Sequence, residues 1–379
     1  FIRHTLWRNF YDPYEWQWQD GRSRWDLLDV VRMVRALRPD GIQWPFDKVQ
    51  GKPDVPTNRL ELLTKVNGLD HQSAHDALSD VKATIAVAKL LKEKQPQMFE
   101  YLLKMRDKKQ VRELVNLDDK KPFVYTSGRL EKEHEKTTVA FPLTSGRNGN
   151  VIVYDLRYDP TELVNLNEKE IAAKVFATWQ ERRAEGFVKL PVKELQYNRA
   201  PAVAPLGVLS QGGSWERIHL SEETVQKHLR VLLAKPDFAE RVRSVFEQKP
   251  DFTPVEDPDF QLYDGFVDDA DKTKMRVVRA ADENSLADTS LDFDDERLSK
   301  LLPRYKARSF PRSITASERE AWEAYRTERL LKGKNGQLSL EQFAKRLAEL
   351  AAAKAGDDQA QYLLQELQLY AESIAPISE

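Results

Sequence analysis

Apolar residues recur every three or four positions between residues 24 and 37. Leu27, Val31, Val34 and Leu37 therefore fall on one face of a helix, because 3.6 residues complete one turn. The pattern predicts one amphipathic helix over 24–37, which ends at the Arg-Pro-Asp-Gly sequence that follows it.

Two further helices are predicted before Pro96. The first begins at Asn58, whose side chain can cap the helix while Glu61 completes a capping box, and it ends at an Asn-Gly pair. The second begins near Ser73 and continues to the stop at Pro96. The first 95 residues are therefore predicted to be helices joined by short loops.

Short runs of β-branched and aromatic residues replace the helical pattern after residue 120. They predict strands at 122–126, 137–143 and 151–158, with a hairpin turn at 146–150. The other elements predicted here are a helix at 168–184, strands at 187–192 and 194–198, and helices at 222–235 and 237–248. This region is predicted to be a small barrel or sheet with added helices.

A segment rich in proline and aspartate, residues 250–260, is typical of a domain boundary. From Thr315 onward the pattern is helical again. Two capping boxes are predicted there, Thr315 with Glu318 and Ser339 with Gln342. The predicted fold class is α+β and multi-domain.

Composition and charge narrow the class of protein. The 379 residues carry 59 Lys and Arg against 61 Asp and Glu, so any affinity for nucleic acid must come from local basic patches. The absence of cysteine excludes disulfides and thiolate metal sites, and it agrees with a cytoplasmic protein. No apolar run approaches the roughly 20 residues of a membrane span, so no membrane association is expected.

The string Ser73-Ala-His75-Asp76-Ala-Leu-Ser-Asp80 carries the clearest chemistry. A carboxylate on a helix can hold a divalent cation, and a histidine at the helix start can take a proton from metal-bound water, which together permit phosphodiester hydrolysis. Two alternatives stay open. Asp76 and Ser73 can form a capping box, and the spacing of His75 and Asp80 also marks glycerolipid acyltransferases, which usually associate with membranes.

Longer strings carry a resemblance to a known family. RNFYDPYEW at 8–16, AHDALSDVKATIAVAKLL at 74–91, QLYDGF at 261–266 and LLPRYKARSFP at 301–311 resemble the bacterial exodeoxyribonuclease I family. That family looks like a member of the DnaQ-like nucleases with a ribonuclease-H fold, in which four acidic residues hold two divalent metals and a histidine is the base.

The resemblance implies a reaction and a cofactor. It implies a 3′ to 5′ exonuclease that acts on single-stranded DNA and releases 5′-mononucleotides. On this resemblance His75 is the general base, Asp80 is a catalytic metal ligand, and the cofactor is a pair of Mg²⁺ ions, or Mn²⁺.

The resemblance also implies three domains in a monomer. These are the C-terminal part of a ribonuclease-H-like exonuclease domain at 1–95, an SH3-like domain with added helices at 96–250, and a helical C-terminal domain at 251–379.

The family's first two acidic motifs are expected upstream of Phe1, because no Asp or Glu precedes Asp12. The sequence as printed is therefore expected to be N-terminally truncated, to keep one of the four acidic ligands and to be inactive alone. A rival hypothesis from another class follows, namely a non-catalytic module that binds single-stranded DNA or the single-strand-binding protein.

Aromatic residues crowd the segment 7–18, where Tyr14, Trp16 and Trp18 alternate with polar residues as in an extended strand. With Arg8 they are predicted to form a stacking platform for unpaired bases, since every base has a face that an aromatic ring can cover. The alternative is that these aromatic side chains belong to the core.

A basic run at 297–312 contains six basic residues and no acidic one. Arg304, Lys306 and Arg308 are predicted to neutralise DNA phosphates without reading sequence. The alternative is a solvated linker between helical parts.

Arg38 and Tyr101 stand where the family would place matching residues of a pocket for the acidic C-terminal tail of the single-strand-binding protein. An arginine suits the terminal carboxylate of such a tail, and an apolar floor suits its phenylalanine. The resemblance therefore implies this protein as a partner.

Overall fold

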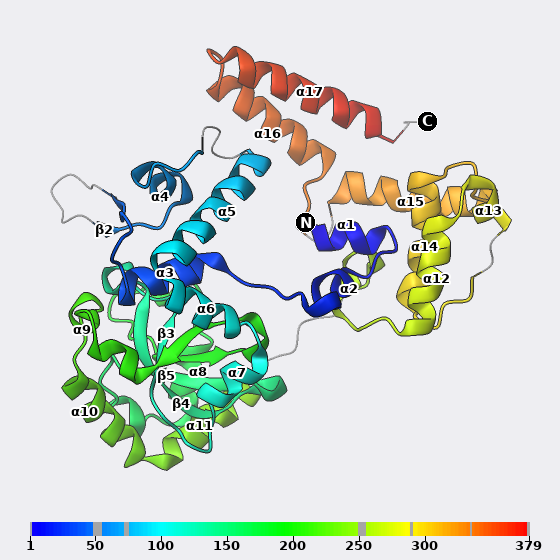
Figure 1. The fold of residues 1–379 in the computed structure, drawn as a ribbon. Helices are drawn as coiled ribbons and strands as arrows, with labels where there is room; N and C mark the ends of the chain where they lie inside the picture. Colours follow the sequence, from blue (N-terminus) through cyan, green and yellow to red (C-terminus); the bar gives the residue numbers. More distant parts are fainter. Residues whose placement is uncertain are drawn as a thin grey trace. The chain divides into compact units, whose positions relative to one another are not determined.

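The computed structural model describes residues 2–47, 55–71, 76–248, 255–288, 291–333 and 336–376 (Figure 1). Contacts within the chain divide it into two compact units. One unit is Gly21–Asp251, and the other joins Phe1–Asp20 to Phe252–Glu379. The first 20 residues therefore pack with the C-terminal part of the chain.

A five-stranded antiparallel sheet forms the centre of the unit at 21–251, with strand order β6-β5-β4-β3-β7. The strands are β3 (Phe123–Thr126), β4 (Thr137–Ser145), β5 (Val151–Asp155), β6 (Val192–Leu195) and β7 (Ala202–Pro205). The predicted hairpin between β4 and β5 is confirmed, since the Gly146 amide donates to the Asn150 carbonyl at 2.9 Å. The register of β4 against β5 shifts between Pro142 and Thr144. Pro142 is the one residue of β4 without an amide hydrogen to donate to its neighbour.

Both faces of this sheet are buried. Val124, Phe141 and Tyr154 belong to one apolar core, whereas Phe123 and Tyr125 belong to another. Successive side chains of a strand point to opposite faces, so covering both faces buries all of β3 and most residues of β4, β5 and β7. This explains why the strands are continuous apolar runs.

The same unit contains nine α-helices in its described part and a short hairpin of β1 (Phe46–Asp47) with β2 (Val55–Pro56). The helices are α3 (Leu27–Leu37), α4 (Leu60–Val66), α5 (Ala77–Lys94), α6 (Pro96–Lys104), α7 (Lys108–Leu114), α8 (Glu168–Val175), α9 (Ser214–Arg217), α10 (Glu222–Leu233) and α11 (Pro236–Glu247). Helix α3 packs against β3, β4 and β7, and α11 packs against β4 (Figure 1). The predicted helices at 24–37, 222–235 and 237–248 are confirmed.

Two predicted helix starts are wrong in detail. Helix α4 follows Arg59, which makes no side-chain cap, and the Asn58 amide oxygen instead accepts from Arg35 at 3.5 Å. Helix α5 begins after Asp76, whose carboxylate accepts from the Ser79 amide at 2.9 Å. The capping box proposed for Ser73 lies outside the described residues.

The predicted helix at 168–184 is shorter, because α8 ends at Val175. Thr178 and Glu181 then cap a separate short turn, with the Glu181 carboxylate accepting from the Thr178 amide at 2.6 Å. The strands predicted at 187–192 and 194–198 are displaced to β6 and β7, since β6 starts only at Val192.

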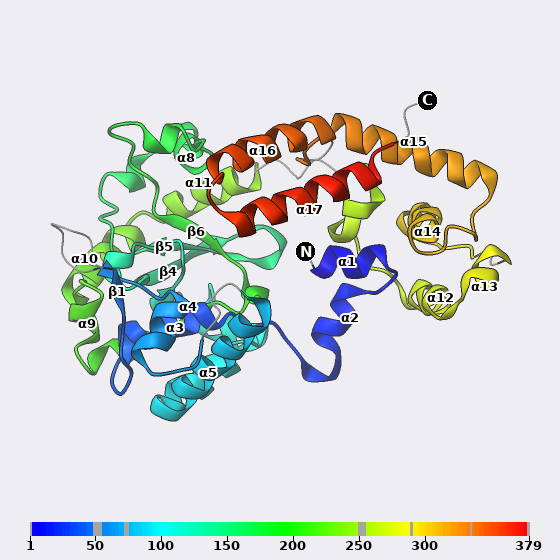
Figure 2. The same ribbon diagram turned by 90° about the horizontal axis from the view of Figure 1, so that it is seen from above.

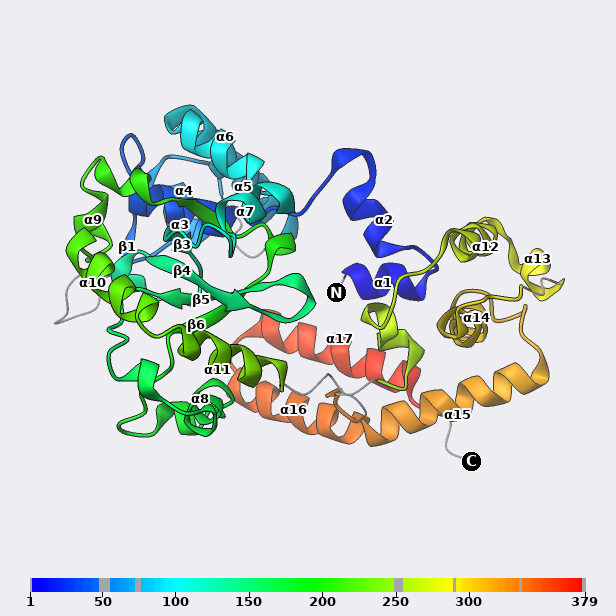
Figure 3. The ribbon, with the colours of Figure 1, turned by 90° about the horizontal axis from the view of Figure 1, so that it is seen from below.

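The second unit is helical. Its elements are α1 (Ile2–Arg8), α2 (Pro13–Trp18), the 3₁₀ segment η8 (Pro258–Tyr263), α12 (Asp269–Ala280), α13 (Glu283–Asp288), α14 (Glu296–Ser309), α15 (Ala316–Lys332), α16 (Leu340–Ala353) and α17 (Asp358–Ile374). Helix α1 lies beside η8, and α16 lies beside α17 (Figures 2 and 3). Trp7 and Phe10 are buried in the core of this unit together with Met275 and Leu298.

The extended conformation predicted for the aromatic segment is wrong. Asp12 caps α2 by accepting from the Tyr14 amide at 2.8 Å, and Pro13 occupies the first helical position. Proline suits that position because its ring presets the helical φ and the missing amide hydrogen is not needed there. Local capping thus decides against the alternating pattern.

The basic run at 297–312 is neither an extended segment nor a linker. It forms most of α14, a helix that contains Pro303 and buries Leu298, Leu301 and Tyr305. Both capping boxes predicted beyond it, at Thr315 and at Ser339, are confirmed.

Candidate functional site

Asp80 lies in the first turn of α5, which the Asp76 cap positions. Its side chain is 43% exposed. A carboxylate in this position is accessible to a ligand, and carboxylate oxygens are the ligands that Mg²⁺ prefers.

A buried histidine contacts this carboxylate. His71 Nε2 lies 2.8 Å from Asp80 Oδ1, and the His71 side chain is only 4% exposed. Its other ring nitrogen, Nδ1, lies 3.3 Å from the hydroxyl of Thr64 on α4. The sequence analysis missed His71, because nothing in the spacing distinguishes it from a loop residue.

His75, the predicted base, lies outside the described residues. In the part of the chain that the structure describes, no group of three or more His, Asp or Glu side chains could hold a metal ion. Asp80 fits a divalent cation by its chemistry and exposure, and it would supply one ligand of such a site.

A cavity of about 290 Å³ opens in the same unit between α3, the β1–β2 hairpin and residues 132–136. Four basic side chains and two acidic ones line it, namely Arg32, Arg59, Lys132, Lys136, Asp47 and Glu135. The Glu135 carboxylate also forms an ion pair with the buried Arg35 at 3.0 Å. Arg32 and Arg59 have carboxylate partners, Asp29 at 2.5 Å and Glu61 at 2.5 Å, so the two lysines supply the excess of positive charge at this cavity.

The cations of this cavity act on one another. Burial lowers the pKa of Lys136, and the nearby Arg32 lowers it further. Concentrated positive charge of this kind is stabilised by an anion such as a phosphate. Sequence reasoning missed the cavity because its residues come from three separate segments.

The structure also places the predicted aromatic platform. Tyr14 and Trp18 lie four residues apart on α2, where Tyr14 is half-buried and Trp18 is 47% exposed. The side chain of Trp16 is not among the side chains that the structure describes. The Tyr14 ring centroid lies 5.3 Å from that of Phe266, which is 83% exposed. Phe266 and the exposed Tyr263 extend the aromatic surface, although the sequence analysis did not select them.

Arg8 is engaged inside its own unit. Its guanidinium lies 4.9 Å from the centroid of the Phe260 ring, and its Nε donates to the Asp259 carbonyl at 3.4 Å. Arg8 therefore helps hold α1 against η8, whether or not it also contacts DNA.

The three basic residues predicted to bind phosphate have carboxylate partners. Arg304 pairs with Asp257, Arg308 lies 3.5 Å from Asp259, and Lys306 lies 3.7 Å from Glu318. Lys306 is also buried. The basic run is thus neutralised within the fold, and these contacts give no support to a role in DNA binding.

Arg38 and Tyr101 both lie in the unit at 21–251. Arg38 donates to the Val208 carbonyl at 3.2 Å and to the Gln211 side chain at 3.3 Å, so it anchors the 206–214 loop. Tyr101 packs against both cores of the sheet, and burial raises its pKa to about 12.

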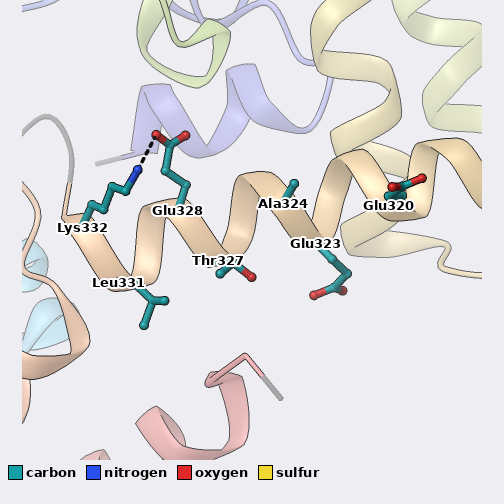
Figure 4. Close-up of a pocket in the computed structure, with 7 residues that line it drawn as sticks. All are labelled: Glu320, Glu323, Ala324, Thr327, Glu328, Leu331 and Lys332. Carbon is teal, nitrogen blue, oxygen red and sulfur yellow. Dashed lines mark ion pairs between the residues drawn. The ribbon is translucent and has the colours of Figure 1, made fainter. Parts of the chain in front are cut away.

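A second hollow, of about 490 Å³, lies along one helix (Figure 4). All its lining residues come from α15, and they include three glutamates, of which Glu328 pairs with Lys332 at 3.6 Å. A surface of this charge does not suit a phosphate.

Among the described helices, none is long and apolar enough to cross a membrane.

Two family models match the chain. The Exonuclease I SH3-like domain matches residues 106–248, and the Exonuclease I C-terminal domain matches residues 256–374. These matches agree with the sheet and with the C-terminal helices. The three predicted domain ranges, 1–95, 96–250 and 251–379, stay a prediction.

Relatives and solved structures agree with these matches. Exodeoxyribonuclease I of Escherichia coli K12 is 36% identical over 379 residues, which cover 98% of this chain and 76% of the relative. This chain superposes on the crystal structure of E. coli exonuclease I in complex with a dA16 oligonucleotide with a TM-score of 0.89 at 35% identity. The match covers 98% of this chain and 78% of the E. coli chain.

Two further structures of similar coverage carry other ligands. They are the zinc ion bound form of the E. coli ExoI-ssDNA complex, with a TM-score of 0.86 at 35% identity, and the ExoI/SSB-Ct complex, with a TM-score of 0.84 at 33% identity. Each covers 98% of this chain and 77% of the matched chain. The chain belongs to the exodeoxyribonuclease I family and is an enzyme of the exonuclease class.

Proposed function

We propose that the protein degrades single-stranded DNA from the 3′ end and releases 5′-mononucleotides with the help of divalent metal. The observation that carries this proposal is the exposed carboxylate of Asp80 at the start of α5, in a member of this family. The relatives crystallised with oligonucleotides support single-stranded DNA as the substrate.

Asp80 would hold a divalent cation, and His75 would take the proton from the attacking water. A bound divalent cation makes water acidic enough to supply hydroxide near neutral pH and stabilises charge on the phosphate. We propose Mg²⁺, with Mn²⁺ as a substitute and two ions in the complete site, as the family resemblance implies. The zinc-bound relative supports a divalent ion in general.

The cation-lined cavity and the aromatic surface would bind the DNA strand by different means. Lys132 and Lys136 would contact phosphates, which any sequence presents. Tyr14 and Phe266 would stack on bases, because the exposed ring of Phe266 gains most from being covered.

Removal of the Asp80 carboxylate tests the proposed reaction. In the full-length gene product with magnesium, Asp80→Asn should slow the release of nucleotide from a 3′-labelled oligonucleotide by at least about a hundredfold, since even outer residues of metal sites cost 10- to 100-fold. Asp70→Asn, which changes an exposed carboxylate in the preceding loop, is the matched control and should leave the rate unchanged.

Two results would contradict the exonuclease proposal. Equal rates for wild type and Asp80→Asn would remove Asp80 from the site. Binding of the oligonucleotide without any release of nucleotide would replace the enzyme by the non-catalytic binding module.

We also propose that Arg38 and Tyr101 receive the C-terminal tail of the single-strand-binding protein, as the SSB-Ct complex of a relative supports. Arg38→Ala should weaken binding of a tail peptide about tenfold, the cost of one charge-assisted contact, as measured by fluorescence anisotropy. Because Arg38 also anchors the 206–214 loop, thermal unfolding of the variant serves as the control. An unchanged affinity would exclude Arg38 from the peptide site.

A further inference from the structure

We infer that His71 is a positioning residue that orients the Asp80 carboxylate for metal binding. The inference rests on the proposed function, since it takes Asp80 to be a metal ligand. It concerns the contact between His71 Nε2 and Asp80 Oδ1 at 2.8 Å.

The two side chains differ sharply in exposure. The Asp80 side chain is 43% exposed, whereas that of His71 is 4% exposed. Fixing one rotamer of a solvent-exposed carboxylate when a ligand binds costs entropy. A buried ring that already holds one carboxylate oxygen lowers this cost, which is the general benefit of preorganisation.

His71 is itself supported from α4. Its Nδ1 lies 3.3 Å from the hydroxyl of Thr64, a fully buried side chain whose hydroxyl also lies 2.9 Å from the Leu60 carbonyl. A ring with its hydrogen on Nε2 donates to Asp80, and its Nδ1 competes with the Leu60 carbonyl for the single hydroxyl hydrogen of Thr64. Two helices that flank the loop thus set the ring in place.

This arrangement has a general chemical counterpart. Residues behind a metal ligand fix its orientation, and their loss typically weakens metal affinity 10- to 100-fold. A purely structural tie between α4 and α5 would instead change stability and leave metal affinity alone. The two roles therefore predict different results.

The test uses Mn²⁺ as the probe and the full-length gene product as the protein. The dissociation constant for Mn²⁺, measured by the loss of the free-ion electron paramagnetic resonance signal, should rise about 10- to 100-fold in His71→Leu. The magnesium concentration for half-maximal nuclease rate should rise in parallel, while KM for the oligonucleotide stays unchanged. His71→Gln keeps an N–H donor of similar reach and should restore most of the affinity.

Two controls keep the result interpretable. Thr64→Val removes the support behind the ring and should weaken Mn²⁺ binding less than His71→Leu does. If His71→Leu does not fold, the comparison of wild type, His71→Gln and Thr64→Val decides. The inference is wrong if folded His71→Leu binds Mn²⁺ as tightly as wild type does. If His71→Leu does not fold, the inference is wrong if Thr64→Val binds Mn²⁺ as tightly as wild type does.

Asp80→Asn separates this inference from the proposed function. If Asp80→Asn abolishes metal binding and activity while His71→Leu changes neither, only the role of His71 is wrong. If Asp80→Asn changes neither, Asp80 is not a ligand, and both proposals are wrong.

Discussion

The two units balance their positive charges in different ways. One unit joins residues 1–20 to 252–379 and is called the C-terminal unit. In it, Arg308 and Arg329 lie 3.5 and 3.2 Å from the buried carboxylate of Asp259, and Arg304 pairs with Asp257. In the other unit, four basic side chains share a cavity with only two acidic ones. Arg32 and Arg59 of the cavity pair with Asp29 and Glu61 as well, so the excess of positive charge there comes from Lys132 and Lys136.

The pKa values of one lysine from each unit, Lys274 and Lys193, shift in opposite directions. A hydrogen bond to Asp271 raises the pKa of Lys274 in the C-terminal unit. Burial lowers the pKa of Lys193 in the sheet to about 8, and its ammonium contacts the hydroxyls of Tyr125 and Ser127 instead of a carboxylate. Carboxylates thus hold the lysine of one unit, and hydroxyl groups hold the lysine of the other.

Loss of the carboxylate at Asp259 should have the largest effect. Asp259→Ala leaves three arginines, Arg304, Arg308 and Arg329, facing an emptied, buried position, and breaking a buried ion pair in this way costs about 3 to 5 kcal/mol in the free energy of unfolding. Urea denaturation measures this free energy. Asp264→Ala, at an exposed position close by, is the control, and equal stability of the two variants would show that the arginines do not depend on Asp259.

Loss of the exposed ring at Phe266 should weaken DNA binding next most strongly. Stacking on one aromatic side chain contributes about 1 to 3 kcal/mol, so Phe266→Ala should raise Kd for oligo-dT by about 5- to 150-fold. The salt dependence of binding should stay the same, because no charge is lost. Val277→Ala, another exposed apolar side chain of this unit, should bind as wild type does.

Charge removal at the cavity should change the salt dependence instead. Each phosphate contact contributes about 0.7 to the slope of log K against log salt for single strands, so Lys132→Gln with Lys136→Gln should lower the slope by about 1.4. The matched pair Arg304→Gln with Arg308→Gln should lower stability and leave the slope unchanged. If instead only the Arg304→Gln, Arg308→Gln pair lowers the slope, the basic run at 297–312 binds the DNA and the proposed difference between the units is wrong.

The smallest expected effect is a pH dependence of stability due to Lys193. Its pKa is about 8 in the folded state and about 10.5 in the unfolded chain, so between these values the unfolded state binds more protons. Stability should therefore rise with pH across this window, by about 1 kcal/mol for each pH unit. Lys193→Met should lack this rise in urea denaturation at pH 7.5 and pH 10, and an equal rise in both proteins would exclude Lys193 as its source.

Local signals in the sequence predict much of the fold. The capping boxes at Thr315 and Ser339 form as predicted, and the apolar runs become the strands β3, β4 and β5. The errors occur where two local signals compete. At residues 12–18 the Asp-Pro cap outweighs the alternation of aromatic residues, and at Asn58 a bond to Arg35 replaces the expected cap.

The candidate site divides in the same way. Asp80 and its helix follow from the sequence, because a cap and a helical pattern depend on neighbours within a few positions. His71 and the cavity do not, because they depend on which distant segments meet.

The sequence by itself therefore determined most of the elements, the family and the position of one candidate metal ligand. The tertiary structure decided which charges are paired, which aromatic rings are exposed and which histidine supports Asp80. The physical reason is that hydrogen-bonded turns and caps act over three or four residues, whereas the pairing of a charge and the burial of a side chain depend on everything that packs around it.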